Sequence, residues 1–318
     1  MALFESKADS SATFTLRTAD GLELFGYRWL PAEAPRAVVQ IVHGLAEHAG
    51  RYARLAQALN AAGYAVYAND HRGHGRTAKS AEELGFLAEQ DGWRKCVNDL
   101  WQVNRHIAAE HPEIPIVMLG HSMGATLAEQ FMGEHGDALA GVVLSGGNGK
   151  PTTMAAMGRK ITRAERLRLG ARGKSKLVQS LTFDAFNKRC APARTAFDWL
   201  SRDPAEVDKY VADPLCGFPA SVQLWVDLMD GWAAVSRPAH RRRVPRSLPV
   251  YVIAGGRDPV SGNTRQLGPW LEEYRAAGIM NLEHKFYPEA RHELFNETNR
   301  DEVTAELVGW LDRVIARN

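Results

Sequence analysis

The chain contains 318 residues, enough for one large domain or two ordinary ones. Hydrophobic residues make up 45% and charged residues 24%, values typical of a globular protein, which excludes a wholly disordered or fibrous chain. The net charge of +2, from 39 basic and 37 acidic residues, predicts no nucleic-acid partner. No apolar run approaches the roughly 18 residues of a membrane span, and the charged first ten residues do not resemble a secretory signal peptide.

The three cysteines of the chain are Cys96, Cys190 and Cys216. Their number is small and odd, and none forms a CxxC pair, so the sequence predicts neither a disulfide framework nor a zinc site. We therefore expect a reduced compartment, the cytoplasm, and we expect no metal and no cofactor.

The first predicted elements are two alternating segments, residues 12–18 and 22–30, which Asp20 and Gly21 join as a hairpin. Further strands are predicted at short, almost continuous apolar runs: residues 37–42, 64–68, 116–119, 141–144, 250–254 and 282–287. Such runs are typical of a parallel sheet that helices cover on both faces.

Apolar residues at helical spacing separate these strands, at residues 51–62, 93–109 and 303–314. The alternation predicts a mostly parallel, doubly wound α/β fold.

The alternation stops after Leu144 and resumes at Leu248. The residues between them are basic, rich in Trp and Phe, and helical in pattern. We expect a helical cap at residues 148–247, inserted into a core formed by residues 1–147 and 248–318.

Ser122 is the candidate nucleophile. It lies in Gly120-His121-Ser122-Met123-Gly124, between a buried strand and the helix-like residues 125–135. A sharp strand-to-helix turn exposes a serine hydroxyl and requires small residues two positions before and after it. The N–H of Met123 opens the helix, where the helix dipole favours an oxyanion.

A serine nucleophile needs a base and an orienting acid, which follow it in chain order in serine hydrolases built on open α/β sheets. Asp258 follows the strand at residues 250–254, and His292 follows the strand at residues 282–287. Both positions lie just beyond the carboxyl ends of strands, where such sheets build their sites.

The alternatives are weaker. Ser145 also follows a strand but has no preceding glycine, so a loop position is expected. His284 lies inside a strand, and His240 adjoins three arginines and is expected in solvent. Asp227 and Asp230 lie in the cap and are expected at the surface.

Five motifs together resemble one branch of the α/β-hydrolase superfamily. They are HGxxEHxxRY (43–52), ANDHRGHG (68–75), GHSMG (120–124), GGRD (255–258) and RHE (291–293). In this order they resemble the monoacylglycerol lipases and bacterial lysophospholipases, over about residues 12–315. The resemblance implies an α/β-hydrolase fold with an inserted cap and the catalytic triad Ser122, Asp258 and His292.

The same resemblance implies that the N–H groups of Leu45 and Met123 form the oxyanion hole. It also implies that Glu47 and Arg51 hold a glycerol head; their spacing of four fits a simple ion pair on a helix surface equally well. His71 and His74 offer a His-x-x-His pattern, but in this family that loop is structural.

The first part of the cap, residues 154–181, contains eight Lys or Arg against one acid, Glu165, beside an apolar stripe. This pattern fits either peripheral contact with anionic lipid or a solvated helix face. The aromatic residues that follow can line an acyl tunnel or form the cap's own core. Cys216 is expected to be a small buried residue.

The sequence thus predicts a serine hydrolase of carboxylic esters that acts on single-chain lipid esters, such as monoacylglycerols or lysophospholipids, through an acyl-enzyme. Three alternatives stay open. A general carboxylesterase and a serine peptidase or amidase would use the same triad, and a ligand-binding receptor would use the same fold without catalysis.

Overall fold

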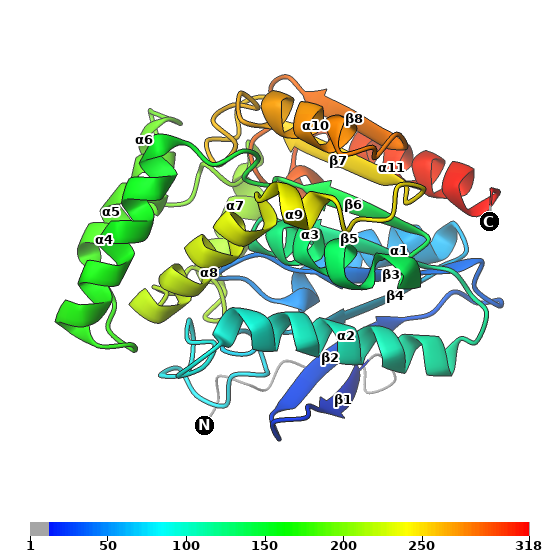
Figure 1. Cartoon of the computed structure of the whole chain (residues 1–318), viewed down its shortest axis with the longest axis horizontal. Coiled ribbons are helices and arrows are strands. Elements are labelled where there is room, and N and C mark those ends of the chain that lie inside the picture. The colour runs from blue at the N-terminus through cyan, green and yellow to red at the C-terminus, as the bar shows by residue number, and fades with distance from the viewer. Residues whose placement is uncertain (1–12, 318) are drawn as a thin grey trace.

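A computed structural model describes residues 13–317. The described strands form one eight-stranded sheet in the order β1-β2-β4-β3-β5-β6-β7-β8 (Figure 1). The predicted hairpin is confirmed: β1 (Thr13–Arg17) and β2 (Glu23–Trp29) pair antiparallel, and Gly21 takes a φ of 85° in the turn. β2 also pairs antiparallel with β4, and all remaining neighbours are parallel.

Six strands follow the hairpin along the chain. They are β3 (Ala37–Val42), β4 (Tyr64–Asn69), β5 (Ile116–His121), β6 (Gly141–Ser145), β7 (Val250–Gly255) and β8 (Leu282–Tyr287). Every residue of β3 to β7 is buried, because helices cover both faces of the sheet.

Two helical layers enclose the sheet. α1 (Ala53–Ala61) and α11 (Arg300–Ile315) cover one face, and α2 (Gly92–Glu110), α3 (Met123–His135) and α10 (Leu267–Ala276) cover the other. Each layer has its own apolar core, and the predicted doubly wound α/β fold is confirmed. Over residues 13–317, three short 3-10 helices add to the loops: η3 (Ala49–Tyr52), η4 (Gly136–Ala138) and η5 (Leu294–Asn296).

Six helices connect β6 to β7. They are α4 (Thr153–Leu169), α5 (Lys176–Leu181), α6 (Phe183–Lys188), α7 (Pro204–Ala212), α8 (Val222–Val235) and α9 (Pro238–Arg241). In Figure 1, α4, α5 and α6 stand to one side of the sheet. α8 contacts α4 and also packs on α2 and α3. A Cβ on Gly231 of α8 would lie 2.2 Å from the ring of Trp93, which shows how closely α8 approaches α2.

Three residues are placed differently from the sequence-based expectation. His240 is buried, and its Nε2 hydrogen-bonds the Glu129 carbonyl at 2.8 Å. Asp227 is buried in α8 and accepts a hydrogen bond from Gln223 at 2.8 Å. Ser145 is the buried last residue of β6. For His240 and Asp227, flanking charges and polar character led to the wrong prediction, because their burial depends on the packing of α8 and α9 against α3. For Ser145, the strand runs one residue further than the apolar run indicated.

Within residues 13–317, no helix combines the length and the apolar character that crossing a membrane requires.

Candidate active site

Ser122 occupies the strained turn between β5 and α3. Its φ of 56° and ψ of −117° are unusual for a residue with a side chain, and such strain often accompanies functional sites. A Cβ on Gly120 would lie 2.4 Å from the Gly124 carbonyl oxygen, and a Cβ on Gly124 would lie 2.0 Å from the Val42 carbonyl oxygen. Only glycine therefore fits at either position.

His292 and Asp258 form a buried pair. The Nδ1 of His292 lies 3.0 Å from Oδ2 of Asp258, and Val260 donates its N–H to Oδ1 of the same carboxylate at 2.9 Å. Asp258 is fully buried and His292 is 1% exposed. A neutral imidazole in this arrangement donates from Nδ1 and leaves the lone pair on Nε2 free to accept a proton.

Two histidines near Ser122 differ in basicity. Burial alone disfavours a charged His292, but the charge of Asp258 and its hydrogen bond outweigh this and raise the pKa of His292 above its ordinary value. The ring of His121 lies 4.7 Å from that of His292. Burial, reinforced by His292, lowers the pKa of His121 to about 4. When one of these two rings takes up a proton, His292 is therefore the one that carries it.

A cavity of about 500 Å³ opens above Ser122. Ser122 and His292 line its base, together with Leu45 and Met123, the expected oxyanion donors. The walls come from the segment between β6 and β7: Ile161, Phe183, Trp199, Trp225 and Leu228 are among them. The structure thus brings the predicted nucleophile, the predicted general base and the expected oxyanion donors to one apolar cavity. Asp258 does not line this cavity and contacts it through His292.

The loop after β3 passes close to Ser122. A Cβ on Gly44 would lie 3.2 Å from Cβ of Ser122. Among the residues that the structure describes, neither the Leu45 N–H nor the Met123 N–H has a hydrogen-bond partner. Both amides are therefore available to a substrate oxygen.

The next residue of this loop, Ala46, has a φ of 58° and is held by its carbonyl. That carbonyl oxygen accepts hydrogen bonds from the Gly217 N–H at 2.9 Å and from the Tyr210 hydroxyl at 2.7 Å. The segment after α7 thus fixes the position of the loop that carries Leu45.

The ion pair expected between Glu47 and Arg51 is present at 2.6 Å, but the two side chains are only 4% and 11% exposed, so it does not lie on an open helix surface. Oε1 of Glu47 accepts the Gly44 N–H at 2.6 Å and the Tyr52 hydroxyl at 3.0 Å. Arg51 also binds both carboxylate oxygens of Glu293 at 2.7 Å. Glu293 is part of the RHE motif, but no local pattern indicated its contact with Arg51, which lies 242 residues away in the chain.

The loop at residues 68–75 is braced as the resemblance implied. Asp70 accepts the Ala49 N–H at 2.8 Å and the Arg76 N–H at 2.6 Å. His71 and His74 hydrogen-bond backbone carbonyls at 3.1 Å, and burial lowers the pKa of His71 to about 3 and that of His74 to about 4. Both imidazoles therefore serve this loop as neutral groups.

A serine on a strained turn, a buried Asp–His pair and a covered apolar cavity define an α/β hydrolase. Residues 33–299 match the family described as "Serine aminopeptidase, S33", and the chain belongs to this family. It is 31% identical over 287 residues to a monoacylglycerol lipase of Mycolicibacterium smegmatis, covering 89% of this chain and 90% of the relative. It is 28% identical over 295 residues to the monoglyceride lipase of Homo sapiens, covering 89% and 88%.

Among solved structures, a thermostable carboxyl esterase from Bacillus coagulans, in complex with glycerol, superimposes with a TM-score of 0.88. It is 26% identical, and the match covers 95% of this chain and 98% of that one. The expected family resemblance, the α/β-hydrolase fold and the enzyme class, a serine hydrolase of carboxylic esters, are thereby confirmed.

Proposed function

We propose that the protein hydrolyses single-chain lipid esters, monoacylglycerols in the first place, with Ser122, His292 and Asp258 as its catalytic triad. The observation that carries the proposal is the apolar cavity of about 500 Å³ whose base holds Ser122 and His292. A cavity of this size and character suits one acyl chain better than a polar substrate.

The reaction proceeds through an acyl-enzyme. The Ser122 hydroxyl attacks the ester carbonyl while Nε2 of His292 takes its proton, and Asp258 stabilises the imidazolium that forms. The N–H groups of Leu45 and Met123 stabilise the oxyanion. His292 returns the proton to the leaving alcohol, and water then repeats these steps on the acyl-enzyme.

The alcohol part of the ester lies toward Glu47, which lines the cavity beside Gly44. The similar esterase of Bacillus coagulans is in complex with glycerol, the alcohol part of a monoacylglycerol. Arg51 does not line the cavity, and both Glu47 and Glu293 occupy its guanidinium. Arg51 therefore contributes to glycerol binding by holding the Glu47 carboxylate in place.

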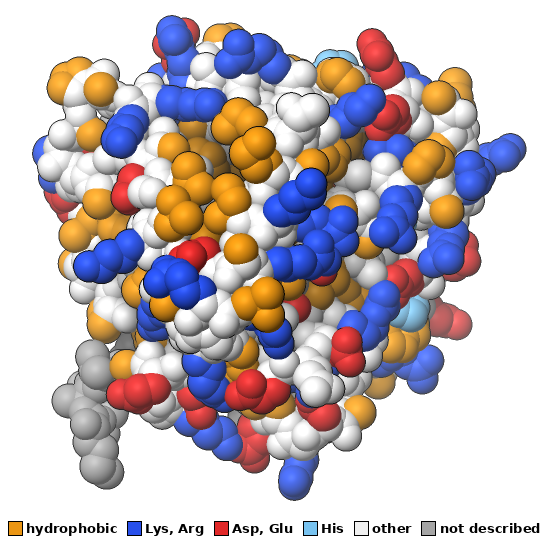
Figure 2. All heavy atoms as spheres, turned by 60° about the vertical axis from the view of Figure 1, so that its left-hand side comes forward, with side chains coloured by type: hydrophobic (Ala, Val, Ile, Leu, Met, Phe, Trp, Pro, Cys, Tyr) orange, Lys and Arg blue, Asp and Glu red, His pale blue; other side chains and the backbone are white. Residues whose placement is uncertain are grey.

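Residues 148–247 form the cap in this proposal, and its outer face meets lipid. Exposed apolar side chains of this segment include Leu167 and Leu177, and also Met154, Met157 and Leu181, which line the cavity as well. Figure 2 shows hydrophobic groups in the middle of this face, with Lys and Arg around them. Such a face favours peripheral contact with a lipid surface.

The charge of the cap face is smaller than residues 154–181 suggested. Arg159 and Arg163 pair with Asp230, Arg168 pairs with Glu165, and Arg172 pairs with Glu89. Contact with anionic lipid is therefore proposed as mainly apolar, with lysines such as Lys160 adding attraction. Cytoplasmic location is proposed with it, supported by three cysteines that are all free.

The family description favours a specific alternative, an aminopeptidase. Such an enzyme needs a carboxylate in its cavity to hold a peptide amino terminus. Among the described residues, Glu47 and Glu293 line the cavity, and Arg51 binds both of them. No carboxylate of the described cavity wall is therefore free for an ammonium group, which favours ester hydrolysis.

The proposal is tested by comparing wild type with Ser122→Ala on monoacylglycerols, lysophospholipids, p-nitrophenyl esters and aminoacyl p-nitroanilides. Wild type should prefer monoacylglycerols, and Ser122→Ala should lose about 10⁶ in kcat and all labelling by a fluorophosphonate. Retained activity in Ser122→Ala would refute the proposed catalytic triad. Preference for the anilides supports the peptidase instead.

A further inference from the structure

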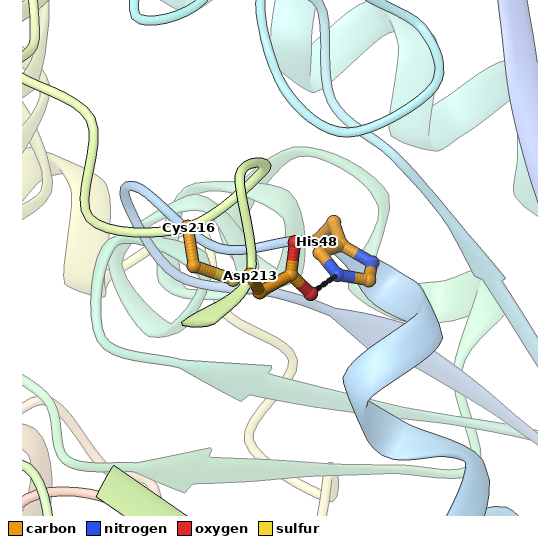
Figure 3. Close-up of side chains that lie close together, drawn as sticks. All are labelled: His48, Asp213 and Cys216. Carbon is orange, nitrogen blue, oxygen red and sulfur yellow. Dashed lines mark hydrogen bonds and ion pairs between the residues drawn. The ribbon is translucent and has the colours of Figure 1, made fainter. Parts of the chain in front are cut away.

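A second group of reactive side chains lies next to the active-site loop but does not line the ester cavity. It comprises His48, Asp213 and Cys216, and Figure 3 shows the three side chains converging. Their ligand atoms all lie within 4.8 Å of one another. His48 precedes η3, whereas Asp213 and Cys216 lie in the turn after α7, so the group joins the core to the cap segment.

We propose that these three residues bind a soft divalent cation, such as Zn²⁺, and that the bound ion slows ester hydrolysis by shifting the loop that carries Leu45. An imidazole nitrogen, a thiolate and a carboxylate oxygen are a ligand set that zinc accepts, with water in the fourth position. The effect of the ion on ester hydrolysis depends on the function proposed above, whereas binding of the ion does not.

The geometry needs only small movements to accept an ion. Nε2 of His48 lies 2.9 Å from Oδ2 of Asp213, the distance of a hydrogen bond. Ligand atoms around a tetrahedral zinc lie roughly 3.3–3.8 Å apart, given metal–ligand bonds of about 2.0–2.3 Å. The ion therefore replaces the proton that His48 shares with Asp213 and opens this pair slightly. The thiol proton of Cys216 leaves to solvent, and the thiolate sulfur moves inward to the ion.

The surroundings favour a cation and give it access. The negative charges of Asp70, which is fully buried, and Asp213 both act on the His48 ring. At the Cys216 sulfur the Arg51 guanidinium is the strongest single charge, and the carboxylates of Asp213, Glu47 and Glu293 act against it. The Asp213 side chain is 30% exposed and provides the route from solvent.

Occupancy couples to the active site through the backbone. Gly217, directly after Cys216, donates its N–H to the Ala46 carbonyl at 2.9 Å. Ala46 has a φ of 58° and follows Leu45, the proposed oxyanion donor. Because Ala46 is already held in a strained conformation, pulling Cys216 toward the ion moves Gly217 and with it the Leu45 N–H.

Binding is tested with Cd²⁺, whose bond to a thiolate gives a charge-transfer absorption in the near ultraviolet. Titration of the full chain should give this absorption with one Cd²⁺ per chain by calorimetry. Cys216→Ser should abolish it, and His48→Asn and Asp213→Asn should each weaken binding by at least about tenfold. Cys190→Ser is the matched control, because Cys190 is also free but lies outside the group, and it should bind like wild type.

Coupling is tested by adding Zn²⁺ to the esterase assay. Losing one oxyanion donor costs about 10²–10³ in kcat, so a partial shift should lower kcat by about tenfold with little change in KM. EDTA should restore the rate. Cys216→Ser should have the same basal rate as wild type, and Zn²⁺ should not change it.

Three results overturn the proposal. They are absence of thiolate absorption in wild type, absorption that survives in Cys216→Ser, and inhibition by Zn²⁺ that survives in Cys216→Ser, as zinc on His292 would produce. Saturation by Cd²⁺ or Zn²⁺ with unchanged kcat removes the coupling. A chain without esterase activity that still binds Cd²⁺ through Cys216 refutes the proposed function and leaves the metal site standing.

Discussion

Arg51 binds both carboxylate oxygens of Glu293, the residue directly after His292, at 2.7 Å. The same guanidinium binds Glu47, whose other oxygen holds the Gly44 N–H at 2.6 Å. One buried cation thus connects the loop after β3 with the loop that carries His292. Attraction to Arg51 and its hydrogen bonds more than offset burial and lower the pKa of Glu293 to about 2, so Glu293 stays ionised.

Arg51→Met should destabilise the fold by about 3–5 kcal/mol, because it leaves two buried carboxylates without their cation. Chemical denaturation at pH 7 measures this free energy of unfolding. The control is Arg257→Met, which also removes an arginine from an ion pair. Arg257 and Glu289 lie 3.4 Å apart, and both side chains are more than half exposed. That variant should change the free energy by less than about 1 kcal/mol. Equal effects of the two variants would refute the structural role of Arg51.

Asp258→Asn should fold normally and lose about 10⁴ in kcat, because an amide favours the wrong tautomer of His292. Steady-state kinetics on a monoacylglycerol checks this, with circular dichroism to confirm the fold. Asp230→Asn is the control, since the Asp230 side chain of α8 is 37% exposed and pairs with Arg159 and Arg163. An inactive Asp230→Asn beside an active Asp258→Asn would mean that the acid is misassigned.

Tyr210→Phe should lower kcat by about tenfold or less, because it removes one of the two donors that hold the Ala46 carbonyl. Tyr64→Phe is the matched control: it also removes a hydroxyl hydrogen bond, to Asp312 at 2.6 Å, but far from the cavity. Both variants should lose stability by about 0.5–1.5 kcal/mol. The positioning role fails if kcat changes equally in the two variants.

Glu129 predicts a dependence of stability on pH. Burial raises the pKa of Glu129 to about 7, although the Tyr274 hydroxyl and the Trp270 N–H both donate to its carboxylate. Since the folded pKa lies above the unfolded value near 4.3, the stabilisation is complete below that value and is lost as the pH rises through 7.

The free energy of unfolding of wild type should therefore fall, relative to that of Glu129→Gln, by a few kcal/mol from pH 5 to pH 8. Urea denaturation at the two pH values measures the difference. Glu134→Gln, one turn later in α3, is the control. Burial raises the pKa of Glu134, but hydrogen bonds from Arg94 and Gln130 outweigh it and lower that pKa overall. Its stabilising contribution is therefore lost only at lower pH, and its difference from wild type should stay constant from pH 5 to pH 8.

The exposed leucines of the cap predict a dependence on the lipid surface. Leu167 is 85% and Leu177 is 47% exposed, and neither lines the cavity. Replacing both by Gln should lower activity on mixed micelles and leave activity on a dissolved short-chain ester unchanged. Met280→Gln, at a 77% exposed position outside residues 148–247, should change neither rate. Equal losses on the two substrates would contradict lipid contact by the cap.

Local patterns predicted the sheet well. The strands at residues 37–42 and 282–287 have the predicted bounds, because continuous apolar runs and flanking turn residues are short-range signals. The positions of Ser122, Asp258 and His292 followed from motif order and from the ends of parallel strands. These signals need no knowledge of which distant segments meet.

Long-range contacts could not be predicted in this way. The contact between Arg51 and Glu293 spans 242 residues, and that between His48 and Asp213 spans 165. The burial of Asp227 and His240 likewise depends on helices that pack only in the folded chain. The local sequence around a polar residue does not indicate which distant residue will contact it. Its partners and its burial are therefore known only from the structure.

α8 belongs to two parts of the molecule at once. Trp225 and Leu228 face the cavity, while Gly231 of the same helix lies against Trp93 of α2. Substitutions that reshape the acyl pocket are therefore tolerated unequally along the chain. The helices α4 to α6 can diverge or be exchanged to alter chain-length preference, whereas α8 must satisfy the core in every variant. Directed evolution of new ester specificity should accordingly accumulate changes in α4 to α6 and leave the Gly231 side of α8 untouched.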